Sequence, residues 1–144
     1  MFPKLVVATG LAVMMASSAV AETIEVQMLN KGSDGSPMVF EPSYVKLAPG
    51  DTLKFIATDR GHNAESIMDR SPEGSEDFKG KINQEIEVTF DIEGWYAIQC
   101  KPHFAMGMVM AVEVGDADVP EDFLEGRLPR RAKDRLEAAV ANGQ

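Results

Sequence analysis

Alternation of apolar and polar residues along the chain predicts a succession of short β-strands. The pattern is clear over residues 22–29, where Ile24, Val26 and Met28 are separated by polar residues, as in a half-buried strand. The same criterion predicts strands over residues 38–40, 44–47, 52–57, 85–91, 95–100 and 108–114. Because the early strands are joined by short, turn-rich segments without a helical period, we expect antiparallel hairpins and no β-α-β units.

The longest stretch without a period of either kind covers residues 58–84. Gly61, Pro72, Gly74 and Gly80 interrupt it, so we expect a loop with at most one turn of helix. Loops of this length within a compact domain usually have a function. His62 lies near its start.

The pattern changes after Gly115. Asp118 can cap a short helix that extends to about Glu125, and Pro129 can open a second helix that Gly143 ends. The second helix would carry one apolar stripe, formed by Ala132, Leu136, Ala139 and Val140. The chain is therefore predicted to be mainly β, with a C-terminal extension of two helices packed outside the β-domain.

The N-terminus has the three parts of a secretory signal peptide. Lys4 provides the positive charge, Leu5–Ala16 the apolar segment, and Ala19-Val20-Ala21 the small-residue cleavage site. We therefore assign residues 1–21 to a signal peptide and 22–144 to one domain, with the β part over 22–115 and the helices over 116–144. The apolar run is short for a membrane span of about 20 residues. We expect no membrane insertion after cleavage; an uncleaved anchor is the alternative.

The chain is acidic, with a formal net charge of −9 over 144 residues, and removal of Lys4 with the signal peptide makes it one unit more negative. This charge argues against nucleic acid and against an anionic membrane surface as partners.

The residues able to bind a transition metal are few and gathered together. Cys100 is the single cysteine, His103 is one of two histidines, and Met106 and Met108 follow; His62 is the other histidine. A lone thiol in an exported protein needs an explanation, and metal ligation protects it from oxidation. Two imidazoles, a thiolate and a weak axial thioether are the ligands of a mononuclear blue-copper centre that transfers electrons.

Two thioethers compete for the axial position. Met106 would give a shorter ligand loop, whereas Met108 begins the next predicted strand, where its side chain is held more firmly. We favour Met108.

Several segments of the chain resemble the pseudoazurin family of small periplasmic blue-copper proteins. They are residues 25–32, Phe40-Glu41-Pro42, Pro49-Gly50-Asp51, Gly61-His62-Asn63, Glu65-Ser66-Ile67, Pro72-Glu73-Gly74 and Cys100-x-Pro102-His103-x-x-Met106-Gly107-Met108. The ligand loop alone would also suit a plastocyanin; the extension from Asp118 onward resembles the pseudoazurins. The resemblance implies a cupredoxin-like Greek-key β-sandwich or barrel that binds one copper through His62, Cys100, His103 and Met108.

The resemblance also assigns roles around the copper. Asn63 would direct its backbone N–H at the Cys100 sulfur, Pro102 would remove a second donor because it lacks an N–H, and Met38 would pack near the His103 ring. Lys101 and Gln99 depart from the family, in which threonine and lysine are expected there. This shift of one positive charge concerns the docking surface and not the copper.

The predicted function is one-electron transfer between redox proteins. The edge of His103 would reach the surface through an apolar collar of Met38, Pro102, Phe104, Ala105 and Met106. Around it, Lys31, Arg60, Lys79, Lys81 and Lys101 would steer an acidic partner. By the resemblance, the acceptor is a nitrite reductase of denitrification and the donor a cytochrome. We expect a monomer in the periplasm.

The same residues bear on three other functions. An oxidase or reductase needs further histidines for a second copper, and this chain has none left, so we expect no enzymatic activity. A structural zinc site is disfavoured because a thioether is a poor fourth zinc ligand. A copper chaperone or scavenger is the main alternative, since Met106, Met108 and Met110 are ligands that suit Cu(I).

Overall fold

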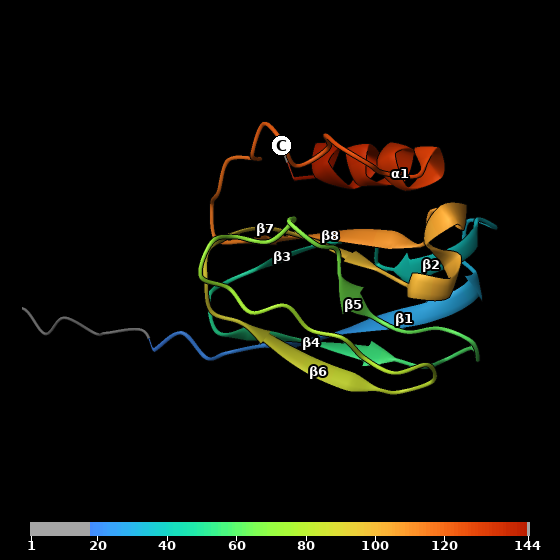
Figure 1. Ribbon diagram of the computed structural model, residues 1–144. Coiled ribbons are helices and arrows are strands. Elements are labelled where there is room, and N and C mark those ends of the chain that lie inside the picture. The colour runs from blue at the N-terminus through green and yellow to red at the C-terminus, as the bar shows by residue number, and fades with distance from the viewer. Residues whose placement is uncertain (1–17, 144) are drawn as a thin grey trace, which may run out of the picture.

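The computed structural model describes residues 18–143, which form two packed β-sheets, one α-helix and one short 3₁₀ helix (Figure 1). The first sheet has the order β2-β1-β4-β6 and contains β1 (Thr23–Lys31), β2 (Pro37–Glu41), β4 (Asp51–Ile56) and β6 (Ile86–Phe90). The second has the order β3-β8-β7-β5 and contains β3 (Tyr44–Leu47), β8 (Val109–Val114), β7 (Gly94–Gln99) and β5 (Glu65–Ser66). Each predicted strand is present, within a residue or two of the predicted ends.

The pairing of the strands differs from the predicted hairpins. β1 pairs with β2 and β7 with β8 in antiparallel fashion, but β1 pairs with β4, and β3 with β8, in parallel. The links from β2 to β3 and from β3 to β4 cross from one sheet to the other. The prediction of successive hairpins was wrong there, because alternation shows which side of a strand is buried and not which strand lies beside it.

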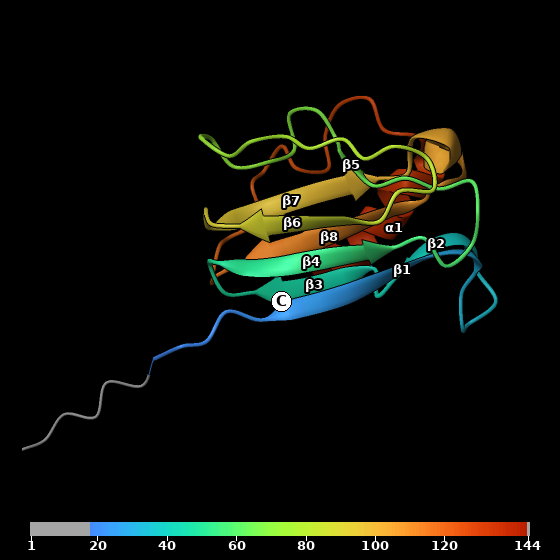
Figure 2. The same cartoon turned by 90° about the horizontal axis from the view of Figure 1, so that it is seen from below.

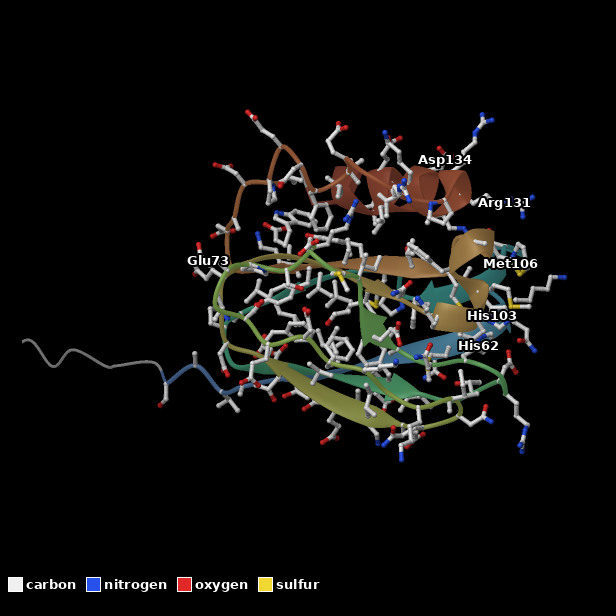
Figure 3. All side chains as sticks on the ribbon, in the orientation of Figure 1. His62, Glu73, His103, Met106, Arg131 and Asp134 are labelled. Carbon is white, nitrogen blue, oxygen red and sulfur yellow. The ribbon has the colours of Figure 1, made fainter. Side chains whose placement is uncertain are left out.

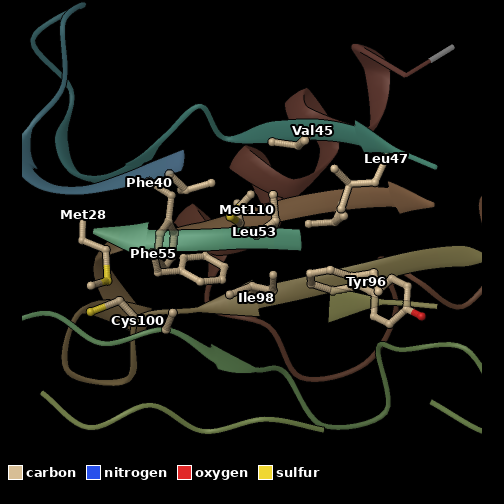
Figure 4. Packing of buried hydrophobic residues seen from close by; sticks show 14 of the residues in the cluster. Met28, Phe40, Val45, Leu47, Leu53, Phe55, Tyr96, Ile98, Cys100 and Met110 are labelled. Carbon is tan, nitrogen blue, oxygen red and sulfur yellow. The ribbon is translucent and has the colours of Figure 1, made fainter. Parts of the chain in front are cut away.

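The core between the sheets extends to the end of the sandwich where β7 leads into β8. Its large, fully buried side chains include Met28, Phe40, Leu53 and Phe55. Cys100 belongs to the same cluster and lies beside Met28 at one end of it (Figure 4). The thiol is therefore placed by the packing of the core.

The α-helix α1 (Arg130–Ala141) covers the outer face of the second sheet. In the view from below, α1 lies behind β7 and β8, on the side away from β4 and β6 (Figure 2). The predicted stripe is the buried face of the helix, and it packs with Trp95 and Phe123 in a second apolar cluster. The second of the two predicted helices is thus confirmed.

The first predicted C-terminal helix, from Asp118 to Glu125, is wrong. These residues form turns, closed by bonds from Phe123 N to the Pro120 carbonyl and from Glu125 N to the Asp122 carbonyl, both 3.0 Å long. Helix nucleation is costly, and a segment of this length gains little from propagation. The packing of Phe123 against Trp95 holds the segment instead.

The long segment after β4 contains turns and the short strand β5, but no turn of helix. It is fixed by an antiparallel backbone β-bridge between Glu65 and Lys79 and by a 2.9 Å hydrogen bond from Gly80 N to the Ala64 carbonyl. Most of the predicted signal peptide, residues 1–17, lies outside the described residues. Within residues 18–143, no helix combines the length and the apolar character needed to cross a bilayer.

Candidate metal centre

Three of the four predicted copper ligands come from the connection between β7 and β8. Cys100 directly follows β7, His103 lies in the short 3₁₀ helix η1 (Lys101–Met106), and Met108 directly precedes β8. A bond from Cys100 N to the Met108 carbonyl (3.0 Å) and one from Met108 N to the His103 carbonyl (3.1 Å) hold the three residues together. His62 arrives from the long segment after β4, and Figure 3 shows it beside His103 at the same end of the sandwich.

The donor atoms of His62, Cys100 and His103 face one another. The Cys100 Sγ atom lies 3.7 Å from His62 Nδ1 and 3.5 Å from His103 Nδ1, and the two Nδ1 atoms are 3.1 Å apart. Nitrogen and sulfur donors lie about 2.0–2.3 Å from a metal such as zinc, so a trigonal set is separated by about 3.4–3.7 Å. The two sulfur–nitrogen distances lie in this range and the nitrogen–nitrogen distance is slightly shorter, so the two imidazoles and the thiol are close enough to bind a single ion.

A hydrogen bond sets the orientation of His62. Its Nε2 atom lies 2.8 Å from the Asn30 side-chain oxygen, which can only accept, so the proton is on Nε2 and the Nδ1 lone pair is directed at Cys100. Burial lowers the pKa of His62, as does the nearby His103, whereas Asp59 opposes this. Burial and the neighbouring His103 therefore favour the neutral imidazole that a metal requires.

The Cys100 thiol is fully buried, and this burial raises its pKa. Backbone N–H groups of Asn63 and His103 act against this, because they donate toward the sulfur and favour the thiolate. The donor predicted at Asn63 is therefore in position. Pro102 provides no N–H, but the next residue, His103, does, and this second donor was not anticipated from the sequence.

The Asn63 side chain connects three parts of the site. Its oxygen accepts the Lys101 backbone N–H at 2.7 Å, and its nitrogen donates to Glu65 Oε2 and to the Gly80 carbonyl, each at 3.0 Å. Asn63 is 3% exposed; its bonds to Glu65 and Gly80 are buried, and its bond to Lys101 is partly buried. The side chain ties the residue after His62 to the start of η1.

The two competing thioethers occupy different environments. Met108 is fully buried in the same cluster as Cys100, whereas Met106 is partly exposed at the end of η1. Gly107, between them, has the left-handed φ of 87° that reverses the chain. The arrangement favours Met108 as the fourth ligand. Met110 is also fully buried, within β8.

The predicted apolar collar is largely at the surface. Pro102 and Ala105 are exposed, and Met38, Phe104 and Met106 are partly exposed. Met38 packs against the main core from β2, which contacts η1.

The five predicted docking cations are all exposed: Lys31, Arg60, Lys79, Lys81 and Lys101. Lys79, Lys81 and Lys101 line one hollow beside Pro102. Lys31 and Arg60 lie on neighbouring segments, because Asn30 N bonds to the Asp59 carboxylate at 2.8 Å. Both ion pairs found within residues 18–143 are made by Lys46, so these five cations are available to a partner.

Two contacts that position the site were missed from the sequence. The sequence predicts neither the bond of Asn30 to His62 nor the side-chain bonds of Asn63, for which the resemblance implies only a backbone N–H donor. Neither residue is near the ligand loop in the chain, and no local pattern indicates such a contact.

Comparisons with known proteins agree with this geometry. Residues 26–115 match the plastocyanin/azurin family of copper-binding proteins. A pseudoazurin of Paracoccus pantotrophus is 45% identical over 128 residues, which cover 88% of each chain, and one of Methylorubrum extorquens is 46% identical over 117 residues, which cover 80% of this chain and 78% of that one.

The fold is also similar to that of solved pseudoazurin structures. The crystal structure of the pseudoazurin from Methylobacterium extorquens AM1 superimposes with a TM-score of 0.79 at 42% identity, over 85% of this chain and 99% of that one. The predicted cupredoxin fold is therefore confirmed. The chain belongs to the plastocyanin/azurin family of copper-binding proteins and, within it, to the pseudoazurins, which are blue-copper electron carriers and not enzymes.

Proposed function

We propose that the chain carries single electrons in the periplasm, with one copper held by His62, Cys100, His103 and Met108. The observation that carries this proposal is the convergence of two imidazole Nδ1 atoms and one thiol sulfur, which lie 3.1–3.7 Å from one another at the end of the core. Copper supplies a reversible one-electron couple there. A thiolate with two imidazoles and a buried thioether is the donor set that blue-copper sites use.

The protein's contribution is to hold these donors in one arrangement. Asn30 fixes the His62 ring, Asn63 ties Lys101 to the segment after His62, and the buried core fixes Cys100 and Met108. Because the donors sit on a rigid scaffold, little has to move when the charge of the site changes. Small rearrangement is what rapid electron transfer requires.

The half-buried His103 ring is the proposed route for the electron. It lies in η1 among the exposed and partly exposed residues of the collar, so a partner docked on the collar comes within reach of the site. The exposed lysines beside Pro102 would orient an acidic partner before contact. Such encounters are small and short-lived.

The physiological setting rests on the resemblance and the leader sequence. A signal peptide cleaved after Ala21 would export the chain to the periplasm, where we propose a nitrite reductase as acceptor and a cytochrome as donor. We expect the carrier to act as a monomer.

The first experiment is the visible absorption spectrum of the mature protein with Cu(II). We expect an intense thiolate-to-copper charge-transfer band in the orange-red. Changing Met108 to Gln should shift this band, while Met106→Gln, the matched control, should leave it nearly unchanged.

The same experiment separates the carrier from a copper chaperone. A colourless protein that binds Cu(I) and releases it to a chelator would contradict electron transfer and support the chaperone. A band that responds to Met106→Gln and not to Met108→Gln would refute the assigned axial ligand alone.

A further inference from the structure

Helix α1 makes a direct polar contact with the ligand loop, and the contact is made by Arg135. Its Nη1 donates to the Gly107 carbonyl at 2.9 Å and to the Met38 carbonyl at 2.6 Å, and its Nη2 donates to the Pro37 carbonyl at 2.8 Å. Gly107 lies 28 residues and Met38 lies 97 residues before Arg135 in the sequence. One guanidinium thus joins the helix to both β2 and the ligand loop.

The carbonyl of Gly107 belongs to the residue directly before the proposed ligand Met108. Gly107 separates Met106 from Met108, and its N–H closes the turn on the Phe104 carbonyl at 3.0 Å. The loop is also pressed against the helix, since a Cβ at Gly107 would lie 2.9 Å from the Arg131 carbonyl oxygen. A displacement of α1 would therefore also move Gly107, the residue before Met108.

The other two carbonyls fix Met38, the collar residue on β2. Met38 has a φ of 52°, in the left-handed region that residues with a Cβ rarely adopt. Such a conformation persists only where the surroundings impose it. Arg135 bonds to the carbonyls of Met38 and of the residue before it, so it helps impose this conformation.

We propose that Arg135 is a positioning residue of the copper centre, setting the place of Met108 and of Met38 relative to His103. The proposal deepens the proposed function and rests on its ligand set. The planar guanidinium offers several donors in a fixed fork, so it can bond to carbonyls of two segments at once. A lysine has a single nitrogen and cannot reproduce this arrangement.

The test compares Arg135→Ala and Arg135→Lys with Arg131→Ala. Arg131 is an exposed cation one turn earlier on the same helix, so its removal controls for the loss of charge and for a general effect on α1. Two quantities are measured: hydrogen exchange of the Met108 amide in the copper-free protein, and the charge-transfer band of the Cu(II) form.

For Arg135→Ala we expect Met108 amide exchange about tenfold faster, the effect of losing hydrogen bonds of this kind. Exchange of buried β7 amides should stay unchanged, and the band should shift. Arg135→Lys should give intermediate changes and Arg131→Ala none. If Arg135→Ala does not fold, the lysine variant decides alone.

Two results would overturn the proposal. One is an unchanged band with unchanged Met108 exchange in a folded variant. The other is equal acceleration of exchange in β7 and at Met108, which would show a role in overall stability only. If the unaltered protein lacked the band, the ligand set of the proposed function would fail, yet the exchange measurement would still test the link from Arg135 to the loop.

Discussion

The Nε2 atom of His62 lies 2.8 Å from the side-chain oxygen of Asn30, at the end of β1. This bond leaves Nδ1 of the same ring free to face Cys100, 3.7 Å from its sulfur. A residue 32 positions earlier in the chain therefore decides which nitrogen of His62 can bind the metal.

The first prediction concerns Asn30→Ala. Without the acceptor, the His62 ring can change tautomer and rotate, so copper should bind about 10–100-fold more weakly, as for the loss of other partners of metal-binding histidines. Competition with a chelator of known affinity measures this. Asn142→Ala, at an exposed position after α1, is the control and should bind as the unaltered protein does. Equal affinities of all three proteins would refute the role of Asn30.

The second prediction concerns Asn63→Ala. The change removes three hydrogen bonds in a buried setting and leaves the Lys101 N–H and the Gly80 carbonyl without this partner. We expect the free energy of unfolding of the copper-free protein to fall by about 2–4 kcal/mol. Urea unfolding measures it.

The matched control is Asn83→Gly. Asn83 is exposed and accepts one bond, from Gly61 N at 2.7 Å, and glycine adopts its φ of 65° without strain, so the loss should cost about 1 kcal/mol or less. Similar losses in both variants would show that the buried network around Asn63 adds nothing.

Local sequence patterns predicted the strands and the ligand loop well, because each depends on neighbouring residues. Alternation marks the buried side of β4, and the scarcity of cysteine and histidine made Cys100 and His103 stand out. The parallel pairing of β1 with β4 was not predicted, since it depends on which strand packs beside which.

The contacts that position the site could not be predicted from local sequence patterns either, because they join residues that are distant in the chain. Asn30 and Arg135 act on groups far away in the chain, and each looks like an ordinary polar residue where it stands. The error at residues 118–125 is of a different kind. A helix-capping pattern was present there, but the packing of Phe123 determined the conformation.

The third prediction concerns stability at alkaline pH. Burial, together with the 2.6 Å hydrogen bond that the Tyr44 hydroxyl donates to Glu113, raises the pKa of Tyr44 to about 12. In the unfolded chain a tyrosine titrates near about 10. Between these values the folded state binds more protons, so this stabilisation is fully present below pH ~10 and is lost as the pH rises toward ~12.

Tyr44→Phe isolates this contribution, because the other tyrosine, Tyr96, titrates in both proteins. The difference in unfolding free energy between the two proteins should be constant from pH ~7 to ~9 and should shrink above pH ~10. Urea unfolding across this range measures it. A difference that does not change with pH would contradict the prediction.

The fourth prediction concerns the N-terminus that cleavage after Ala21 would create. The Glu22 nitrogen lies 2.9 Å from Asp51 Oδ1, and Asp51 is 7% exposed. In a chain that begins at Glu22 this nitrogen is a charged ammonium, and a charge-assisted hydrogen bond is about twice as strong as a neutral one.

A protein beginning at Glu22 should therefore be more stable than one that keeps Ala21, by about 1 kcal/mol at neutral pH. Asp51→Asn should remove most of that difference, although it lowers the stability of both forms. Thermal unfolding of the four proteins measures it. A difference that survives Asp51→Asn would show that the ammonium does not act through Asp51.

The last prediction concerns steering by Lys81, which lines the hollow beside Pro102. Lys81→Glu reverses a charge next to the collar, so the rate of association with a nitrite reductase should fall by about 2–10-fold at low ionic strength, and the effect should vanish in high salt. The redox potential should hardly change, because Lys81 contacts none of the ligands. Lys54→Glu, within β4, changes the net charge equally and should slow association much less. An equal fall in both variants would mean that net charge alone governs association and that the lysines beside Pro102 do not orient the partner.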